Sequence, residues 1–175
     1  MMETTMATHE LIQRTLILFK PDAVQRGVVG EILTRFERVG LKIIGTKMIA
    51  PDHDHYFKHY EEIGQVITRR GEKVFNNNLE IMNAGPVIAM VLEGIEAVEL
   101  VRQLVGLTEP KASAPGTIRG DFSHMSYNYG DAEDKAIPNL IHASGDLSDA
   151  KQEIPHWFSD NELFDYRVLN EKFTR

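Results

Sequence analysis

A histidine near the C-terminal end of the chain is set among residues that could support nucleophilic chemistry. Residues 138–146 read Pro-Asn-Leu-Ile-His-Ala-Ser-Gly-Asp, so His142 closes a short apolar run and Ser144 follows two positions later. Neutral imidazole is a good nucleophile near pH 7, because its unperturbed pKa lies close to that value. Small residues after it leave room for a bulky electrophile. Taken alone, a single histidine after a strand is more often a buried structural residue.

Two basic residues stand where strand ends and loops would expose them. Lys20 follows the apolar run 14–19, and Arg119 lies in segment 108–121, which is rich in Pro and Gly. A lysine at the end of a strand can reach a ligand above a sheet, and a guanidinium fork suits phosphate oxygens. The alternatives are a solvated lysine and a weak surface ion pair between Arg119 and Asp121. The residues alone leave both alternatives open.

Two further motifs favour ordinary structure over a site. Segment 40–47 resembles a phosphate loop only faintly, because its Lys and Thr are transposed and it lies in an expected strand. Residues 52–55, Asp-His-Asp-His, with His59 four positions after His55, could ligate a metal. Without a third ligand at a familiar spacing, a capped and solvated helix start is the favoured interpretation. The asparagine run 76–78 is too short to count as low-complexity sequence.

Length and composition indicate one globular domain. The chain has 175 residues, of which 42% are hydrophobic and 26% charged, and it contains no cysteine. Its net charge of −7 argues against nucleic-acid binding, and the longest apolar run, 86–92, is too short to span a membrane. We expect a flexible N-terminus over residues 1–12, a folded domain over 13–175 and a cytoplasmic location.

The order of apolar patterns predicts an α+β fold. Strands are expected at 14–19, 41–50, 86–92 and 140–141, and helices at 28–39, 52–62, 95–105 and 147–158, with a partly helical stretch at 64–82. Segment 108–121 is expected to be a long loop, and 127–138 a polar insertion. This order favours a ferredoxin-like antiparallel sheet (βαββαβ) with helices on one face.

Together, these motifs make the chain similar to the nucleoside diphosphate kinase family. The resemblance runs from about Thr15 to Tyr166. It is carried by Lys-Pro-Asp-Ala-Val-Gln-Arg-Gly from position 20, Val-Gly-Glu-Ile-Leu from 29, Arg-Phe-Glu from 35, Asn-Ala-Gly-Pro-Val-Ile-Ala-Met-Val-Leu-Glu-Gly from 83, Gly-Leu-Thr-Glu-Pro from 106, Ala-Pro-Gly-Thr-Ile-Arg-Gly-Asp-Phe from 114 and Asn-Leu-Ile-His from 139.

The resemblance implies a function and a role for each matching position. The γ-phosphate of a nucleoside triphosphate would pass to a nucleoside diphosphate by a ping-pong mechanism through a phosphohistidine at His142. Mg²⁺ would be carried by the nucleotide phosphates, with no direct protein ligand. The positions implied to contact phosphate or ribose are Lys20, Arg102, Thr108, Arg119 and Asn139. Tyr60 and Ser144 would lie beside the histidine, and Glu153 would orient its imidazole.

The sequence also departs from the family pattern. The family usually has His-Gly-Ser-Asp, whereas this chain has Ala143 and Gly145 around Ser144, and Asp146 could partly replace the missing aspartate. An alternative function is therefore a nucleotide-binding regulatory protein with weak or lost transfer. The chain is about six residues longer between Tyr60 and Phe75, which leaves Phe75 as the nearest candidate to stack on the base. The resemblance further implies a homo-oligomer, a tetramer or a hexamer, and the insertion near Tyr127 is expected to contribute to its interface.

Overall fold

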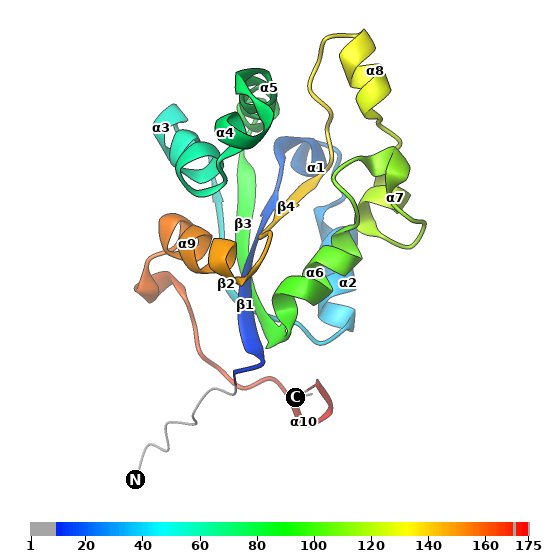
Figure 1. Ribbon diagram of the computed structural model, residues 1–175. Helices are drawn as coiled ribbons and strands as arrows, with labels where there is room; N and C mark the ends of the chain where they lie inside the picture. Colours follow the sequence, from blue (N-terminus) through cyan, green and yellow to red (C-terminus); the bar gives the residue numbers. More distant parts are fainter. Residues whose placement is uncertain (1–9, 170, 175) are drawn as a thin grey trace.

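A four-stranded antiparallel sheet forms the centre of the protein, and its strands lie in the order β2-β3-β1-β4 (Figure 1). The computed structural model describes residues 10–169 and 171–174. The elements are β1 (Ile12–Phe19), α1 (Pro21–Gln25), α2 (Val29–Arg38), β2 (Lys42–Ile49), α3 (His53–Phe57), η1 (Lys58–Ile63), α4 (Val66–Arg70), α5 (Glu72–Met82), β3 (Val87–Ile95), α6 (Ala97–Val105), η2 (Pro110–Ala112), α7 (Ile118–Phe122), α8 (Tyr127–Ala132), β4 (Ile141–Ala143), α9 (Leu147–Trp157), η3 (Asp160–Glu162) and α10 (Glu171–Thr174). This order and pairing confirm the predicted ferredoxin-like antiparallel sheet.

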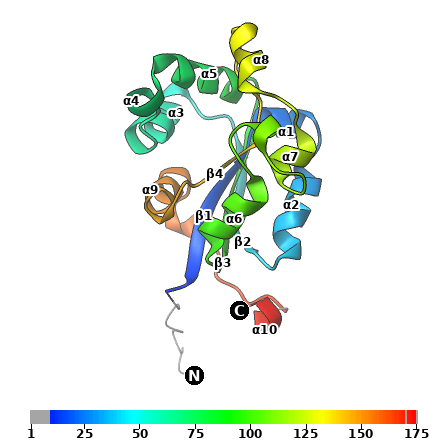
Figure 2. The same ribbon diagram turned by 45° about the vertical axis from the view of Figure 1, so that its right-hand side comes forward.

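Strand β1 is buried on both faces, which corrects the expectation of helices on one face only. Ile17 and Phe19 join a core formed with α2 and α6, whereas Leu16 and Leu18 join a second core formed with α3, η1, α5 and α9. Successive side chains of a strand point to opposite faces, so a run of four buried apolar residues requires two covering layers. The two layers stand on either side of the sheet (Figure 2).

Strand register brings two of the expected site residues to one end of the sheet. Leu18 of β1 pairs with His142 of β4, and Phe19 pairs with Ile141. β1 ends at Phe19, Lys20 follows it as the N-cap of α1, and Pro21 occupies the first position of that helix, where its missing N–H leaves no bond unmade. Lys20, just after β1, therefore lies near His142 on the adjacent strand β4.

Most expected elements are present, and two loops differ. Asp52 caps α3 as predicted, its side chain accepting the His55 backbone N–H at 2.8 Å. The expected long loop 108–121 contains η2 and the start of α7, and the polar insertion contains α8. Both short helices are capped by hydroxyl side chains, of Thr117 and Ser126.

Two further observations concern the ends of the chain. Residues 1–9 of the expected flexible N-terminus lie outside the described residues, and Ile12 already begins β1. Near the other end, the backbone of Phe164 donates to Ile44 of β2 at 2.7 Å, so the C-terminal segment runs along this edge strand. None of the helices in the described part of the chain has the length and apolar character that crossing a membrane requires.

Candidate active site

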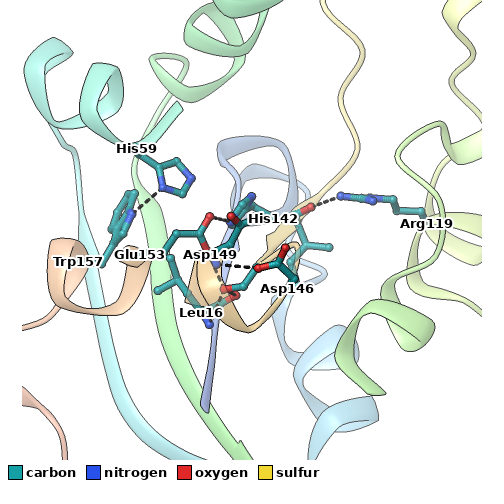
Figure 3. A network of polar contacts seen from close by, with 10 residues as sticks. Leu16, His59, Arg119, His142, Asp146, Asp149, Glu153 and Trp157 are labelled. Atoms are coloured by element: carbon teal, nitrogen blue, oxygen red, sulfur yellow. Dashed lines mark hydrogen bonds and ion pairs between the residues drawn. The ribbon is translucent and has the colours of Figure 1, made fainter. Parts of the chain in front are cut away.

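The imidazole of His142 is held by a carboxylate that is itself held by a hydroxyl. His142 Nε2 lies 3.0 Å from Glu153 Oε1, and Ser144 Oγ donates to Glu153 Oε2 at 2.6 Å (Figure 3). Glu153 comes from α9, while His142 and Ser144 come from β4 and the residue after it. The histidine side chain is 21% exposed and its carboxylate partner is buried. The partly exposed ring of His142 is thus held in place by the buried carboxylate of Glu153.

The charges and hydrogen bonds of His142, Glu153 and Ser144 determine which ring nitrogen of His142 holds the free lone pair. Burial alone would raise the pKa of Glu153, but His142 and the hydrogen bonds from His142 and Ser144 hold it below its usual value. An ionised Glu153 can only accept hydrogen bonds, so Nε2 of His142 carries the proton. In the neutral ring Nδ1 then holds the lone pair, and Nδ1 has no hydrogen-bond partner in the described part of the chain.

A second histidine lies against the first. The rings of His59 and His142 meet edge to face with centroids 4.6 Å apart, and Trp157 Nε1 donates to His59 Nδ1 at 3.2 Å (Figure 3). His59 lies on the π-helix η1, an irregularity often found at functional sites. Burial, followed by the neighbouring His142, lowers the pKa of His59 well below its usual value, so this ring is neutral at pH 7.

The Asp-His-Asp-His motif lies behind this second histidine. His55 stacks on His156 with centroids 3.9 Å apart, and His53 lies 3.5 Å from Asp54. Burial and the neighbouring His156 lower the pKa of His55 to about 4, so it too is neutral at pH 7. Among the described residues, the group with metal-ligand spacing is instead His59, His142 and Glu153.

A strained turn at Leu140 precedes β4, the short strand that carries His142. Leu140 has a φ of 73°, and the backbone N–H of Ile141 donates to the carbonyl of Asn139 at 2.8 Å, which is a γ-turn. Asp22 accepts the Leu140 N–H at 3.0 Å, and the guanidinium of Arg119 donates to the carbonyls of Asn139 and Ile141 at 3.1 and 2.6 Å. These contacts balance a backbone conformation that costs about 1–3 kcal/mol.

A cleft of about 440 Å³ opens beside the histidine. The predicted residues that line it are Lys20, Tyr60, Arg102, Thr108, Arg119, Asn139, His142 and Glu153. Lys20 Nζ donates to Asn139 Oδ1 at 2.8 Å, and Asn139 Nδ2 donates to the Thr108 carbonyl at 3.0 Å. The structure therefore brings together eight of the ten predicted site residues around one cavity.

The buried Lys20 and Arg119 give the part of the cleft beside His142 a positive charge, and the exposed Arg102 also lines the cleft. Burial and the charge of Arg119 lower the pKa of Lys20 to about 8, against the opposing effect of Asp22. Burial, with Arg102 nearby, lowers the pKa of Arg119 to about 10, so Arg119 stays charged at pH 7. A site in which cations are desolvated and mutually repelled is stabilised by an anion.

The remaining predictions have different outcomes. Ser144 is buried behind Glu153 and does not line the cleft. Phe75 is only 4% exposed and packs edge to face on Phe57 in the second core, so its placement corrects the expectation that it stacks on a base. Asp121 pairs with Arg35 at 2.7 Å and not with Arg119.

Sequence reasoning also missed some features of the site. Asp146 caps α9 by accepting the Asp149 N–H at 2.9 Å, which gives this carboxylate a structural role. The bond from Trp157 to His59 and the cleft positions of Arg69 and Arg70 were not anticipated. The single tryptophan of the chain, four residues after Glu153 and therefore on nearly the same helix face, was the available signal.

Comparison with known proteins gives one consistent result. Residues 13–163 match the family described as nucleoside diphosphate kinase. A nucleoside diphosphate kinase of Borreliella burgdorferi is 46% identical over 161 residues, which cover 92% of this chain and 96% of that protein. The corresponding protein of Pyrococcus furiosus is 45% identical over 164 residues, which cover 94% of each.

Solved structures agree with the sequence relatives. A structure described as a transition-state mimic of the Borrelia burgdorferi enzyme, with bound vanadate and ADP, has a TM-score of 0.91 and 44% identity, covering 95% of this chain and 98% of that one. A nucleoside diphosphate kinase of Halobacterium salinarum in complex with CDP has a TM-score of 0.78 and 36% identity, covering 93% and 97%. With its sheet, its histidine and its cleft all in place, the chain belongs to the nucleoside diphosphate kinase family.

Proposed function

We propose that this nucleoside diphosphate kinase transfers phosphate through Nδ1 of His142. The contact between His142 Nε2 and ionised Glu153 carries the proposal, because it leaves the lone pair on Nδ1. In the first half-reaction Nδ1 bonds to the γ-phosphorus while the bond from phosphorus to the β,γ-bridging oxygen breaks. The electron pair leaves with the nucleoside diphosphate, and in the second half-reaction an oxygen of another diphosphate takes the phosphoryl group from Nδ1.

Glu153 stabilises the intermediate that this reaction forms. The phosphorylated ring keeps its proton on Nε2 and gains positive charge, which the carboxylate at 3.0 Å offsets. Ser144 holds the other carboxylate oxygen and so keeps it aligned. Because this trio is complete despite Ala143 and Gly145, nothing in the site favours a protein that has lost transfer.

The cations of the cleft would neutralise the transferred group. Lys20, Arg102 and Arg119 line the cleft, and phosphoryl transfer depends on positioning and charge neutralisation. The hydroxyl of Tyr60 is buried and has no hydrogen-bond partner among the described residues. Burial raises the pKa of Tyr60, so its hydroxyl stays protonated and can donate to a phosphoryl oxygen on the histidine.

We propose that Mg²⁺ enters with the nucleotide and has no protein ligand. Two imidazoles make up most of the described group with metal-ligand spacing, His59, His142 and Glu153, whereas Mg²⁺ prefers oxygen ligands. Bound to the β- and γ-phosphates, Mg²⁺ would reduce the negative charge that opposes attack.

The partners and location are part of the same proposal. Nucleoside di- and triphosphates are the substrates, as the ADP and CDP in the related structures support. A homo-oligomer, tetramer or hexamer, remains a prediction that light scattering can test. A cytoplasmic location remains a prediction from the absence of cysteine.

One experiment tests the central step. The protein is mixed with γ-labelled ATP and Mg²⁺, and the phosphate on protein is counted before and after acid treatment. We expect one acid-labile phosphate per chain, absent in His142→Ala and present in His124→Ala, which alters an exposed histidine outside the cleft. Label that persists in His142→Ala, or no label in the natural protein, would refute the proposal.

A further inference from the structure

Two chain segments contribute aliphatic and amide side chains to the lining of the cleft. One wall is α5, which contributes Val74, Asn77 and Asn78, and the other is the segment after α8, which contributes Ile137. The walls approach closely, because Lys73 at the start of α5 pairs with Asp134 at 2.7 Å. Both elements lie at the same end of the molecule (Figures 1 and 2). This end therefore forms a slot between two chain segments.

The position of the reacting histidine separates the slot from the phosphate end, although Arg69, Arg70 and Lys135 also line the cleft. His142 lies with the buried Lys20 and Arg119, so a nucleotide with its phosphates there extends its base toward the other end of the cleft. The aromatic residue of the α8 segment that lines the cleft, Tyr127, is 43% exposed. In the slot the base would meet the aliphatic side chains of Val74 and Ile137, while Phe75 faces the core.

Two amides in this slot have no hydrogen-bond partner among the residues that the structure describes. Asn77 and Asn78 are half-buried and line the cleft, and neither side chain makes a hydrogen bond within residues 10–169 and 171–174. Each amide offers an acceptor oxygen and two N–H donors. Partly desolvated polar groups without partners cost free energy, which a ligand with complementary groups recovers. The edges of nucleobases carry donors and acceptors that amides match in pairs.

We propose that Asn77 and Asn78 hydrogen-bond to the edge of the nucleobase, so that this enzyme binds the base through polar contacts between aliphatic walls. The inference rests on the proposed function, because the phosphate end fixes where the base lies. It names base recognition as the role of a three-asparagine run that the general fold does not require. Asn76, the first of the three, is exposed and lies outside the cleft.

The test compares a nucleotide with the same ligand without its base. Calorimetry measures the dissociation constants of ADP and ribose 5′-diphosphate for the natural protein, Asn77→Ala/Asn78→Ala and the control Asn76→Ala. Alanine favours helix, so α5 should persist. We expect the double variant to bind ADP about 10-fold more weakly, the scale of one or two hydrogen bonds, and ribose 5′-diphosphate as before. Asn76→Ala should leave both constants unchanged.

Other outcomes overturn the inference in recognisable ways. Unchanged ADP binding in the double variant means that the amides do not contact the base. Equal weakening for both ligands means that they only support the wall. Failure of the proposed function would show separately, as absence of phosphohistidine in the natural protein, whatever the binding constants are.

Discussion

Replacing Glu153 by glutamine removes a charge beside His142 while keeping the shape of the side chain. The amide oxygen can still accept from Nε2 at about 3.0 Å, and Ser144 can accept from the amide nitrogen where it donated before. Two opposite unit charges 4 Å apart interact by about 4 kcal/mol at an effective dielectric constant of 20. The imidazolium charge is shared over the ring and only partly developed in the transition state, so we expect a loss of about 2 kcal/mol, or about 30-fold in rate.

Single-turnover kinetics measure this loss directly. The natural protein, Glu153→Gln and the control Glu80→Gln, an exposed carboxylate on α5, are mixed with labelled ATP and quenched in alkali, and the rate of phosphoenzyme formation is compared. Glu80→Gln should match the natural rate. A rate for Glu153→Gln within about threefold of the natural one would refute the argument, because it would show that the carboxylate charge is not coupled to the reacting ring.

Three further perturbations test other parts of the site. Since nucleotide phosphate favours the charged form of Lys20, whose pKa is about 8 in the free protein, ADP affinity should fall as pH rises from 7 to 9.5, and a flat calorimetric profile would contradict this. Arg119→Lys should lower kcat/KM about 100-fold, because lysine cannot reach the carbonyls of Asn139 and Ile141 together, and near-normal kinetics would remove this bracing role. Phe75→Ala should destabilise the fold by about 3–5 kcal/mol in denaturant unfolding and leave ADP affinity unchanged below the transition, whereas a selective loss of ADP affinity would restore base stacking.

The sequence allowed the strands of the sheet to be predicted for physical reasons, whereas the site residues were predicted from the resemblance to the family. Apolar runs bounded by Pro, Gly and Asp located the strands, and the order of strands and helices along the chain favoured the ferredoxin-like fold, whose neighbouring strands are antiparallel. The resemblance to the family, and not local pattern, predicted that Glu153 lies beside His142, and in the structure α9 follows β4 closely and returns this carboxylate to the ring. The strands themselves depend on local pattern, which a single sequence contains.

Other features depended on packing that local pattern only hints at. The four successive buried residues of β1 required helices on both faces, yet α5 and α9 carry many polar side chains and did not read as core elements. Phe75 shares its helix face with Leu79 and Met82, at spacings of four and seven, and this periodicity points it inward. The positive φ of Leu140 could not be predicted from the sequence, because no glycine occupies this position. Hydrogen bonds made by Asp22 and Arg119, which come from distant segments, hold this backbone conformation.

The pairing of β1 with β4 also has a consequence for how the protein is made. Lys20 bonds to Asn139 across 119 residues of chain, and Leu16 bonds to Ser144 across 128. His59 accepts a hydrogen bond from Trp157, which lies 98 residues later in the chain. During synthesis, β1 therefore emerges from the ribosome long before the last residues that line the cleft. Contacts this far apart in sequence form slowly, so enzymatic activity should appear only at the final stage of folding and serve as its reporter.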